Sequence, residues 1–360
     1  MTALHVRGVL LPEDEPTELW LVGDRVSTEP VPGAETIVDG GFILPGLVDA
    51  HCHIGIKPGA APITSIAEAK ALAELDRDAG VLAIRDAGSP YPYPQLDDDP
   101  DLPRLARAGR HVAPVKRYLR DIGLEVAAEE VPAAVAAQAA AGNGWVKLVG
   151  DWIDRDLGDL APAWDDDTLT AAVTAAHAAG VRITAHTFSE AAVAVLVRAG
   201  IDCVEHGTGL SFDLIDEMAR RGTALVPTMI NIATFDAIAD RAEAKFPTYA
   251  SHMRALQRRF PAVVRAAVEA GVPVYAGTDA GGGIDHGRIV DELLRLHEQA
   301  GMAPADVLRA GSWGARAWLG FPGLTHGGLA DLVAYDRDPR QDLRVLREPR
   351  RIVLRGRVLR

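Results

Sequence analysis

Short apolar runs alternate with amphipathic helical stretches through most of the chain, and no other feature of the sequence constrains the fold as much. Several helical stretches end on a glycine just before the next apolar run, which is where glycine commonly ends a helix. These glycines are Gly80, Gly180, Gly200, Gly222 and Gly271. Strands that alternate with helices in this way predict an α/β fold built on parallel strands.

Eight apolar runs have the length and the flanking residues expected of buried strands. They cover residues 43–53, 81–86, 111–115, 144–149, 181–186, 201–206, 223–228 and 272–279. Eight strands alternating with helices fit a closed barrel, a fold that takes about 250 residues. An open doubly wound sheet is the competitor, but no Gly-x-Gly-x-x-Gly motif follows the first strand. We therefore predict a (β/α)8 TIM-type barrel over residues 44–320.

The two ends of the chain have a different pattern, in which short alternating runs are separated by turn residues. Residues 18–22 and 36–38 are examples near the start, and residues 330–335 and 351–359 are similar near the end. Alternation with a period of two, broken by Gly and Asp, is typical of antiparallel strands. We predict that residues 1–43 and 321–360 together form one small β domain.

The first predicted barrel strand ends in the sequence His51-Cys52-His53. Residues two apart in a strand point the same way, so both imidazoles face the barrel axis at its carboxyl-terminal end, where barrels of this type carry their sites. Cys52 between them points outward, and we interpret it as a small buried apolar residue. Two strand histidines can occur by accident, so this pair needs support from the other strands.

Side chains able to bind a metal stand at the ends of three further predicted strands. His186 ends the fifth strand, His206 the sixth and Asp279 the eighth. Lys147 lies within the fourth strand, where a buried lysine needs a partner. Either a salt bridge or a reaction with CO2, which would turn the amine into an anionic carbamate, accounts for a lysine at this position.

These residues and their neighbours resemble the amidohydrolase superfamily, in particular its imidazolonepropionase-like and prolidase-like members. The matching motifs are ILPGLVDA before the histidine pair (residues 43–50), TAHT (184–187), VEHG (204–207), AGTDA (276–280) and GLADL (328–332). With Lys147 they cover nearly the whole chain, and the ordered set of strand ends is specific.

The resemblance implies a metal centre with a hydrolytic function. The implied ligands are His51, His53 and Asp279 for one ion, and His186 and His206 for a second, with a carbamate on Lys147 as the bridge. Imidazole and carboxylate ligands suit zinc, with iron, nickel or manganese as alternatives, and one divalent ion rather than two is the other open case. Metal-activated hydroxide would attack the substrate, and Asp279 would be the catalytic proton carrier.

Three residues are candidates for binding the substrate. Arg117 and Tyr118 follow the third predicted strand, where the guanidinium could pair either with a substrate carboxylate or with a neighbouring acid. His286 follows Asp279 closely and is interpreted either as a residue bordering the pocket or as a polar loop residue.

Other polar residues near the predicted strands are given structural interpretations. Glu205 precedes a ligand position, so the alternation of the strand turns its side chain away from the axis. The histidines outside the strand-end set, His111 among them, are expected on the surface or on helix faces.

Three functions are compatible with this set of residues. The favoured one is a metal-dependent hydrolase that cleaves an amide or cyclic-amide carbon–nitrogen bond of a small molecule, such as an N-acyl amino acid or a dipeptide. The second is a mononuclear aminohydrolase (deaminase) acting on a heterocycle, in which Lys147 stays unmodified. The third is a non-catalytic barrel that serves as an interaction scaffold, which is disfavoured because every ligand position is filled.

Composition and charge limit the partners. The formal net charge of −13 repels nucleic acid and anionic membranes, so the expected partner is a small-molecule substrate, with a homo-oligomer as an open alternative. The amino terminus does not resemble a secretion signal, and no apolar stretch approaches the roughly 20 residues of a membrane span. With only two cysteines, disulfides cannot be the framework, and a cytoplasmic location is expected.

Overall fold

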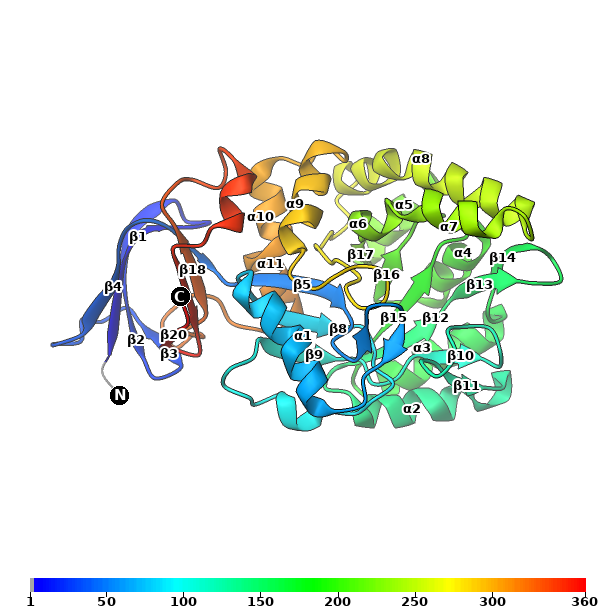
Figure 1. Cartoon of the computed structure of the whole chain (residues 1–360), viewed down its shortest axis with the longest axis horizontal. Helices are drawn as coiled ribbons and strands as arrows, with labels where there is room; N and C mark the ends of the chain where they lie inside the picture. Colours follow the sequence, from blue (N-terminus) through cyan, green and yellow to red (C-terminus); the bar gives the residue numbers. More distant parts are fainter. Residues whose placement is uncertain (1–2) are drawn as a thin grey trace.

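The computed structural model describes residues 3–360 and contains a twisted seven-stranded sheet beside a larger part in which helices surround the strands (Figure 1). The sheet takes its strands from both ends of the chain, in the order β20-β19-β18-β4-β1-β2-β3. Its members are β1 (Leu4–Leu10), β2 (Glu15–Val22), β3 (Arg25–Ser27), β4 (Glu35–Pro45), β18 (Leu332–Tyr335), β19 (Arg351–Leu354) and β20 (Arg357–Val358). Antiparallel pairing of β18 with β4 joins the late strands to the early ones.

The predicted strand over residues 43–53 is divided between the two parts of the molecule. Its first residues belong to β4, and its remainder forms β5 (Leu47–Cys52) in the larger part. Gly46 separates the two strands, and a Cβ atom at this glycine would lie 2.4 Å from the Cβ of Leu82. The chain passes from one sheet to the next at a point where only glycine fits.

The larger part is an α/β structure with parallel strands, as predicted. One sheet has the order β5-β8-β9 and another the order β11-β10-β12-β15-β16-β17, and every pairing in both is parallel. The strands are β8 (Val81–Asp86), β9 (Arg104–Arg107), β10 (Val112–Pro114), β11 (Leu124–Val126), β12 (Trp145–Val149), β15 (Arg182–Thr187), β16 (Cys203–His206) and β17 (Ala224–Val226). Two short hairpins add β6 (Ile56–Lys57), β7 (Ala61–Pro62), β13 (Asp151–Asp154) and β14 (Asp159–Pro162).

The parallel strands differ from the expectation in two further respects. The partner of β8 is β9, which the sequence analysis missed because arginines at both of its ends hide the apolar pattern. Arg104 and Arg107 are accommodated by ion pairs with Asp331 and Asp97. The eighth strand is irregular: residues 272–280 make only isolated bridges, and Pro273 within them lacks a backbone donor.

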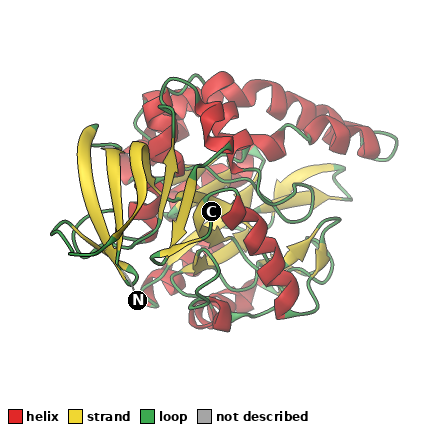
Figure 2. Ribbon diagram, turned by 60° about the vertical axis from the view of Figure 1, so that its left-hand side comes forward, coloured by secondary structure: helices red, strands yellow, loops and turns green. Residues whose placement is uncertain are grey.

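Helices lie on the outside of the parallel strands (Figure 2). They are α1 (Ile66–Asp78), α2 (Val131–Ala141), α3 (Asp166–Ala178), α4 (Glu190–Ala199), α5 (Phe212–Arg221), α6 (Met229–Ile232), α7 (Phe235–Ala242), α8 (Pro247–Glu269), α9 (Ile289–Glu298), α10 (Pro304–Gly311) and α11 (Trp313–Leu319), with short 3-10 turns at Pro94–Leu96, Ala128–Glu130 and Leu343–Arg347. Gly200 and Gly222 end α4 and α5 in the left-handed conformation, as the sequence predicted. Among the described residues, no helix is long and apolar enough to span a membrane.

Candidate metal centre

The six predicted metal ligands come from five separate segments and line one cavity of about 240 Å³. His51 and His53 lie at the end of β5 and just beyond it, Lys147 lies in β12, His186 in β15, His206 at the end of β16, and Asp279 in the irregular segment that follows Val272. The histidines and the lysine are buried, and the Asp279 side chain is 19% exposed. The structure therefore brings together the residues that the sequence had placed at the strand ends.

Asp279 is the centre of the first group. Its Oδ1 lies 3.0 Å from His51 Nε2 and 3.2 Å from His53 Nε2. His53 Nδ1 donates to the carbonyl oxygen of Gly88 at 2.9 Å, and this fixes the tautomer in which Nε2 offers a lone pair to the cavity. Burial alone would raise the pKa of Asp279, but the adjacent His51 and His53 hold that pKa well below its usual range. Asp279 is thus a carboxylate.

His186 and His206 form the second group. His206 Nε2 lies 3.0 Å from His186 Nδ1, and His206 Nδ1 is 2.7 Å from Thr228 Oγ1. Burial lowers the pKa of His206 to about 3, and burial together with His206 lowers the pKa of His186 well below its usual range. Both imidazoles are therefore neutral, which is the form that binds metals.

These two groups fit divalent metal ions by their donor atoms and by their unsatisfied nitrogens. Within residues 3–360, the buried His51 Nε2 and His186 Nε2 make no well-aligned hydrogen bond. His51, His53 and Asp279 offer ligand atoms that all lie within 4.8 Å of one another, and imidazole nitrogens with a carboxylate oxygen are a zinc-binding set. Buried polar atoms normally have partners, so their lack here indicates a missing ligand.

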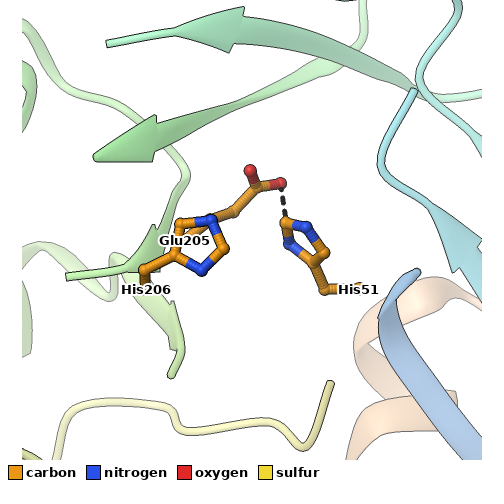
Figure 3. Close-up of side chains that lie close together, drawn as sticks. All are labelled: His51, Glu205 and His206. Atoms are coloured by element: carbon orange, nitrogen blue, oxygen red, sulfur yellow. Dashed lines mark ion pairs between the residues drawn. The ribbon is translucent and has the colours of Figure 1, made fainter. Parts of the chain in front are cut away.

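Glu205 lies on the same side as the ligands, which corrects the prediction that it turns away from them. Figure 3 shows its carboxylate directed toward His51, whose Nδ1 is 3.4 Å from Oε1, with His206 beside it. His206 has a positive φ of 64°, so the regular alternation of β16 is interrupted at the strand end and two consecutive residues reach the interior. Sequence alternation alone could not predict this.

The carboxylate of Glu205 is surrounded by cationic groups. It accepts from Lys147 Nζ, and its Oε1 lies 3.1 Å from Arg85 Nη1. Burial raises the pKa of Glu205, but His51 and Lys147 outweigh that effect and hold the pKa well below its usual range. Lys147 therefore has the salt-bridge partner that a buried lysine requires.

Only one of the three predicted substrate-binding residues lines the cavity. The half-buried Tyr118 ring faces it and packs edge-on against Trp152, with ring centroids 4.9 Å apart. Arg117 points elsewhere: Nη1 is 3.1 Å from Asp154 Oδ2, and Nη2 donates to the carbonyl oxygens of Trp152 and Ala161. Of the two partners considered for Arg117, the neighbouring acid is confirmed as Asp154, and the substrate carboxylate is wrong because Arg117 contacts the β13–β14 hairpin and does not line the cavity.

His286 is also placed away from the cavity. Its side chain is buried on the other side of β5, where Nδ1 lies 2.7 Å from Asp76 Oδ2 of α1. The interpretation of His286 as a residue bordering the pocket is therefore wrong. The alternative of a polar loop residue is incomplete too, since the imidazole is buried within a cluster that includes Cys52.

The structure adds two residues that sequence reasoning missed. His111 is completely buried and stacks on His53 with ring centroids 5.1 Å apart, and burial lowers its pKa well below the usual value. Asn231 of α6 lines the cavity and donates from Nδ2 to Asp279 Oδ2 at 2.7 Å. His111 opens the predicted strand over residues 111–115 but was expected on the surface, and Asn231 lies in a helical turn that carries no sequence motif.

Apolar and aromatic side chains form most of the remaining cavity wall. They are Ile56, Leu119, Trp152, Ile153, Leu160, Phe188, Ile238 and Tyr249, joined by the glycines at 281–283. Of the described residues that line the cavity, none is an arginine, and the lysine among them is paired with Glu205. The site therefore combines a polar floor with a hydrophobic wall.

Comparisons with known proteins agree with this geometry. Residues 159–359 match the model of the amidohydrolase family. An uncharacterized protein of Mycobacterium tuberculosis is 56% identical over 355 residues, which cover 98% of this chain and 95% of that protein. Ochratoxinase of Aspergillus niger is 26% identical over 231 residues, covering 62% of this chain and 47% of the relative.

Solved structures resemble the whole chain. A Xaa-Pro dipeptidase with bound methionine in its active site superposes with a TM-score of 0.82 at 22% identity, covering 99% of both chains. The Aspergillus niger ochratoxinase structure has a TM-score of 0.80 at 20% identity and covers 100% of this chain and 96% of its own. At these identities the similarity shows a shared fold.

Proposed function

The chain belongs to the amidohydrolase family, and from this premise we propose that it cleaves an amide or cyclic-amide bond of a small molecule at the cavity lined by His51 and Asp279. It is a hydrolase of carbon–nitrogen bonds, as the sequence predicted. The observation that carries the proposal is the gathering of buried ligand-type side chains, two of them with unsatisfied nitrogens, around one cavity. The proposed substrates are N-acyl amino acids or dipeptides.

The proposal includes the closed (β/α)8 barrel as the scaffold of the site. It is supported by hydrogen bonds that the irregular eighth segment makes to both of its neighbours. Ala50 of β5 donates to the carbonyl oxygen of Ala276, and Leu225 of β17 donates to that of Pro273, both at 2.8 Å. In such barrels the carboxyl-terminal ends of the strands form the site.

Two divalent ions, for which we propose zinc, would be held by His51, His53 and Asp279 and by His186 and His206. When bound, they would lower the pKa of water and polarise a carbonyl group. The hydrogen bond from His53 Nδ1 to Gly88 orients one ligand, and the contact of His206 Nδ1 with Thr228 orients another.

Asp279 is the proposed proton carrier. Its carboxylate takes a proton from the attacking water and delivers it to the nitrogen of the leaving group. Asn231 donates to Oδ2 and so directs the carboxylate toward the cavity, where it remains partly exposed. The residues of the cavity wall would bind and orient the substrate.

The wall favours a substrate with an apolar or aromatic group beside the scissile bond. Trp152, Phe188 and Tyr118 offer ring faces and edges, and aromatic contacts of this kind add to the free energy of burial. An acidic end of the substrate finds no arginine in the described lining. We therefore propose that side-chain hydrophobicity, rather than a carboxylate anchor, selects the substrate.

Lys147 is proposed to carry a carbamate in the metal-loaded enzyme. Its ammonium must lose two protons as the nitrogen forms a bond to CO2, and Glu205 is in contact to accept one of them while the other goes to solvent. The product is a carbamate anion, an oxygen donor in place of a cation.

A deaminase acting on a heterocycle with a single metal ion is the second candidate. The salt bridge between the unmodified Lys147 and Glu205 favours it, because an ammonium held in this way supplies no ligand. Such an enzyme releases ammonia and needs one ion per chain.

Metal analysis and a substrate screen test these functions together. We expect a dinuclear centre, so that alanine replacement of all the histidine ligands of the cavity removes about two transition-metal ions per chain, and we expect hydrolysis of N-acyl amino acids and dipeptides with aromatic side chains. The His186→Ala/His206→Ala double variant is the control and should lose both turnover and the second ion. Ammonia release from aminated heterocycles with all amides intact would favour the deaminase, and a metal-loaded protein without any turnover would favour the scaffold.

A further inference from the structure

A second cluster of ligand-type side chains lies on the opposite side of β5 from the cavity. Cys52 points away from the cavity, as the strand alternation predicts, toward Asp76 of α1 and His286 of the loop before α9. One ligand atom from each residue lies within 4.8 Å of those of the other two. All three residues are buried, and the side chains of Asp76 and His286 are each 1% exposed.

The ion pair between His286 and Asp76 does not give every buried polar atom of this cluster a partner. His286 Nδ1 lies 2.7 Å from Asp76 Oδ2, and Asp76 Oδ1 accepts from the backbone N–H of Gly287. Among residues 3–360, nothing forms a hydrogen bond with the other ring nitrogen, Nε2, although it is buried. A buried polar atom without a partner costs free energy, so we expect a further group to bind Nε2.

The charges around the cluster favour a cation as the missing group. The acidic groups that act on His286 are Asp76, Asp49 and Asp86, and a metal ion bound in place of a proton on the imidazole would be attracted by the same carboxyl groups. Asp86 is the register partner of Cys52 in the neighbouring strand, and its Oδ2 also lacks a hydrogen bond within the described residues. The side chains that act most strongly on this imidazole are therefore acidic.

We propose that Cys52, Asp76 and His286 bind a zinc ion at a structural site separate from the metal centre of the cavity. A thiolate, a carboxylate and an imidazole are the three ligand types that zinc prefers, and a water molecule completes the four-coordinate shell. Binding releases the thiol proton of Cys52 to solvent, because the thiolate is the ligand. The site does not depend on the proposed hydrolytic function.

The ion would cross-link three segments of the chain. Cys52 belongs to β5, Asp76 to α1, and His286 to the loop that also carries the glycines at 281–283 on the edge of the cavity. A bond network through one ion would hold this loop and α1 against the strand that carries His51 and His53. Its loss should loosen the edge of the cavity without removing any ligand from it.

Cobalt substitution tests the proposal, because cobalt bound to a thiolate has a ligand-to-metal charge-transfer absorption that nitrogen and oxygen ligands do not give. We expect the full-length protein, stripped of metal and titrated with Co²⁺ alone, to show this absorption. Cys52→Ser should abolish it, and the matched variant Cys203→Ser, which removes the other buried cysteine, should retain it. His286→Gln should weaken Co²⁺ binding at this site by at least tenfold.

The His186→Ala/His206→Ala double variant separates this proposal from the function of the cavity. It should keep the thiolate absorption at full intensity even if turnover is lost. Absence of the absorption from the full-length protein, or its persistence in Cys52→Ser, would overturn the structural site. Should Cys52→Ser fail to fold, loss of the absorption in His286→Gln and its retention in Cys203→Ser decide the question.

Discussion

The ammonium group of Lys147 donates to the carboxylate of Glu205 in the interior of the parallel strands, where both side chains are almost completely buried. The same carboxylate pairs with Arg85 and accepts from Thr184 Oγ1 at 2.8 Å. One anion thus compensates two buried cations beneath the metal centre. Glu205 therefore affects both the stability of the fold and the chemistry of the site.

Glu205→Gln should strongly destabilise the protein. Removing one partner of a buried ion pair leaves uncompensated charge, which costs about 3–5 kcal/mol. Urea denaturation followed by circular dichroism measures the change in the free energy of unfolding. Glu217→Gln is the matched control, because Glu217 also pairs with two cations, Arg220 and Arg221, but near the surface, and the loss of stability should be far smaller. Equal effects of the two substitutions would contradict the role of burial.

Lys147→Ala should lower the metal content and the activity together if the lysine is carboxylated. Without the bridging carbamate the second ion has only His186 and His206 as protein ligands. A short-chain acid such as acetate should then restore part of the turnover, whereas Lys147→Arg, which keeps the charge but cannot form the carbamate, should not respond. Full metal occupancy in Lys147→Ala would favour the mononuclear deaminase.

Asp279→Asn should fold normally and lose turnover by ~10²–10⁴-fold, the usual contribution of a general acid–base group. Asparagine still offers an oxygen to a metal but cannot carry a proton. The measurement is kcat, with metal content determined on the same sample. Asn231→Leu, which removes only the hydrogen bond to Asp279 Oδ2, is the control and should reduce kcat much less. Near-normal turnover of Asp279→Asn would remove this residue from the mechanism.

Arg117→Met should lower the melting temperature without changing the preference between acidic and amidated substrates. Its guanidinium holds Asp154 and the β13–β14 hairpin, and it does not reach the cavity. Tyr118→Ala, in contrast, removes part of the cavity wall and should raise KM for both kinds of substrate. An increase in KM confined to acid-ended substrates in Arg117→Met would restore the carboxylate anchor that the structure contradicts.

The strand ends could be predicted from the sequence because each ligand stands at the end of an apolar run whose last residue is clear from the sequence. His51, His186 and Asp279 meet at one cavity for that reason. The same periodicity failed where a strand has charged ends, as in β9, and where φ turns positive, as at His206. Alternation predicts which face a side chain takes only while the backbone stays extended, so the inward position of Glu205 next to the inward His206 could not be predicted from it.

Side-chain partners were beyond the reach of sequence for a different reason. Arg117 is next in sequence to Tyr118, which lines the cavity, yet its guanidinium pairs with Asp154. Asp154 lies in a hairpin that no sequence motif predicts. His286 likewise follows Asp279 closely but turns to Asp76 on the far side of β5. Closeness along the chain predicts that two residues lie in the same region, but it does not predict which way their side chains point. The orientation of the side chains decides which residues contact a substrate.

The stability contributed by His252 should depend on pH in a definite direction. His252 of α8 lies between Asp159 of β14 and Glu190 of α4, with ring nitrogens 2.9 Å and 3.0 Å from their carboxylates. Burial lowers its pKa, but the hydrogen bond and charge of Asp159, helped by Glu190, raise it above the usual value. A group whose pKa is raised by folding stabilises the native state fully below its unfolded pKa of about 6.5 and loses that contribution as the pH rises through the folded pKa.

His252→Gln should therefore lower the melting temperature most at acidic pH, and the deficit relative to the unsubstituted protein should shrink toward alkaline pH. Differential scanning calorimetry of both proteins across that range measures the difference directly. Asp159→Asn is the control background, because without its main partner the imidazolium gains little from folding and the deficit should no longer vary with pH. A deficit that is constant from acidic to alkaline pH would mean that His252 stabilises the packing of α8 through its ring and not through its charge.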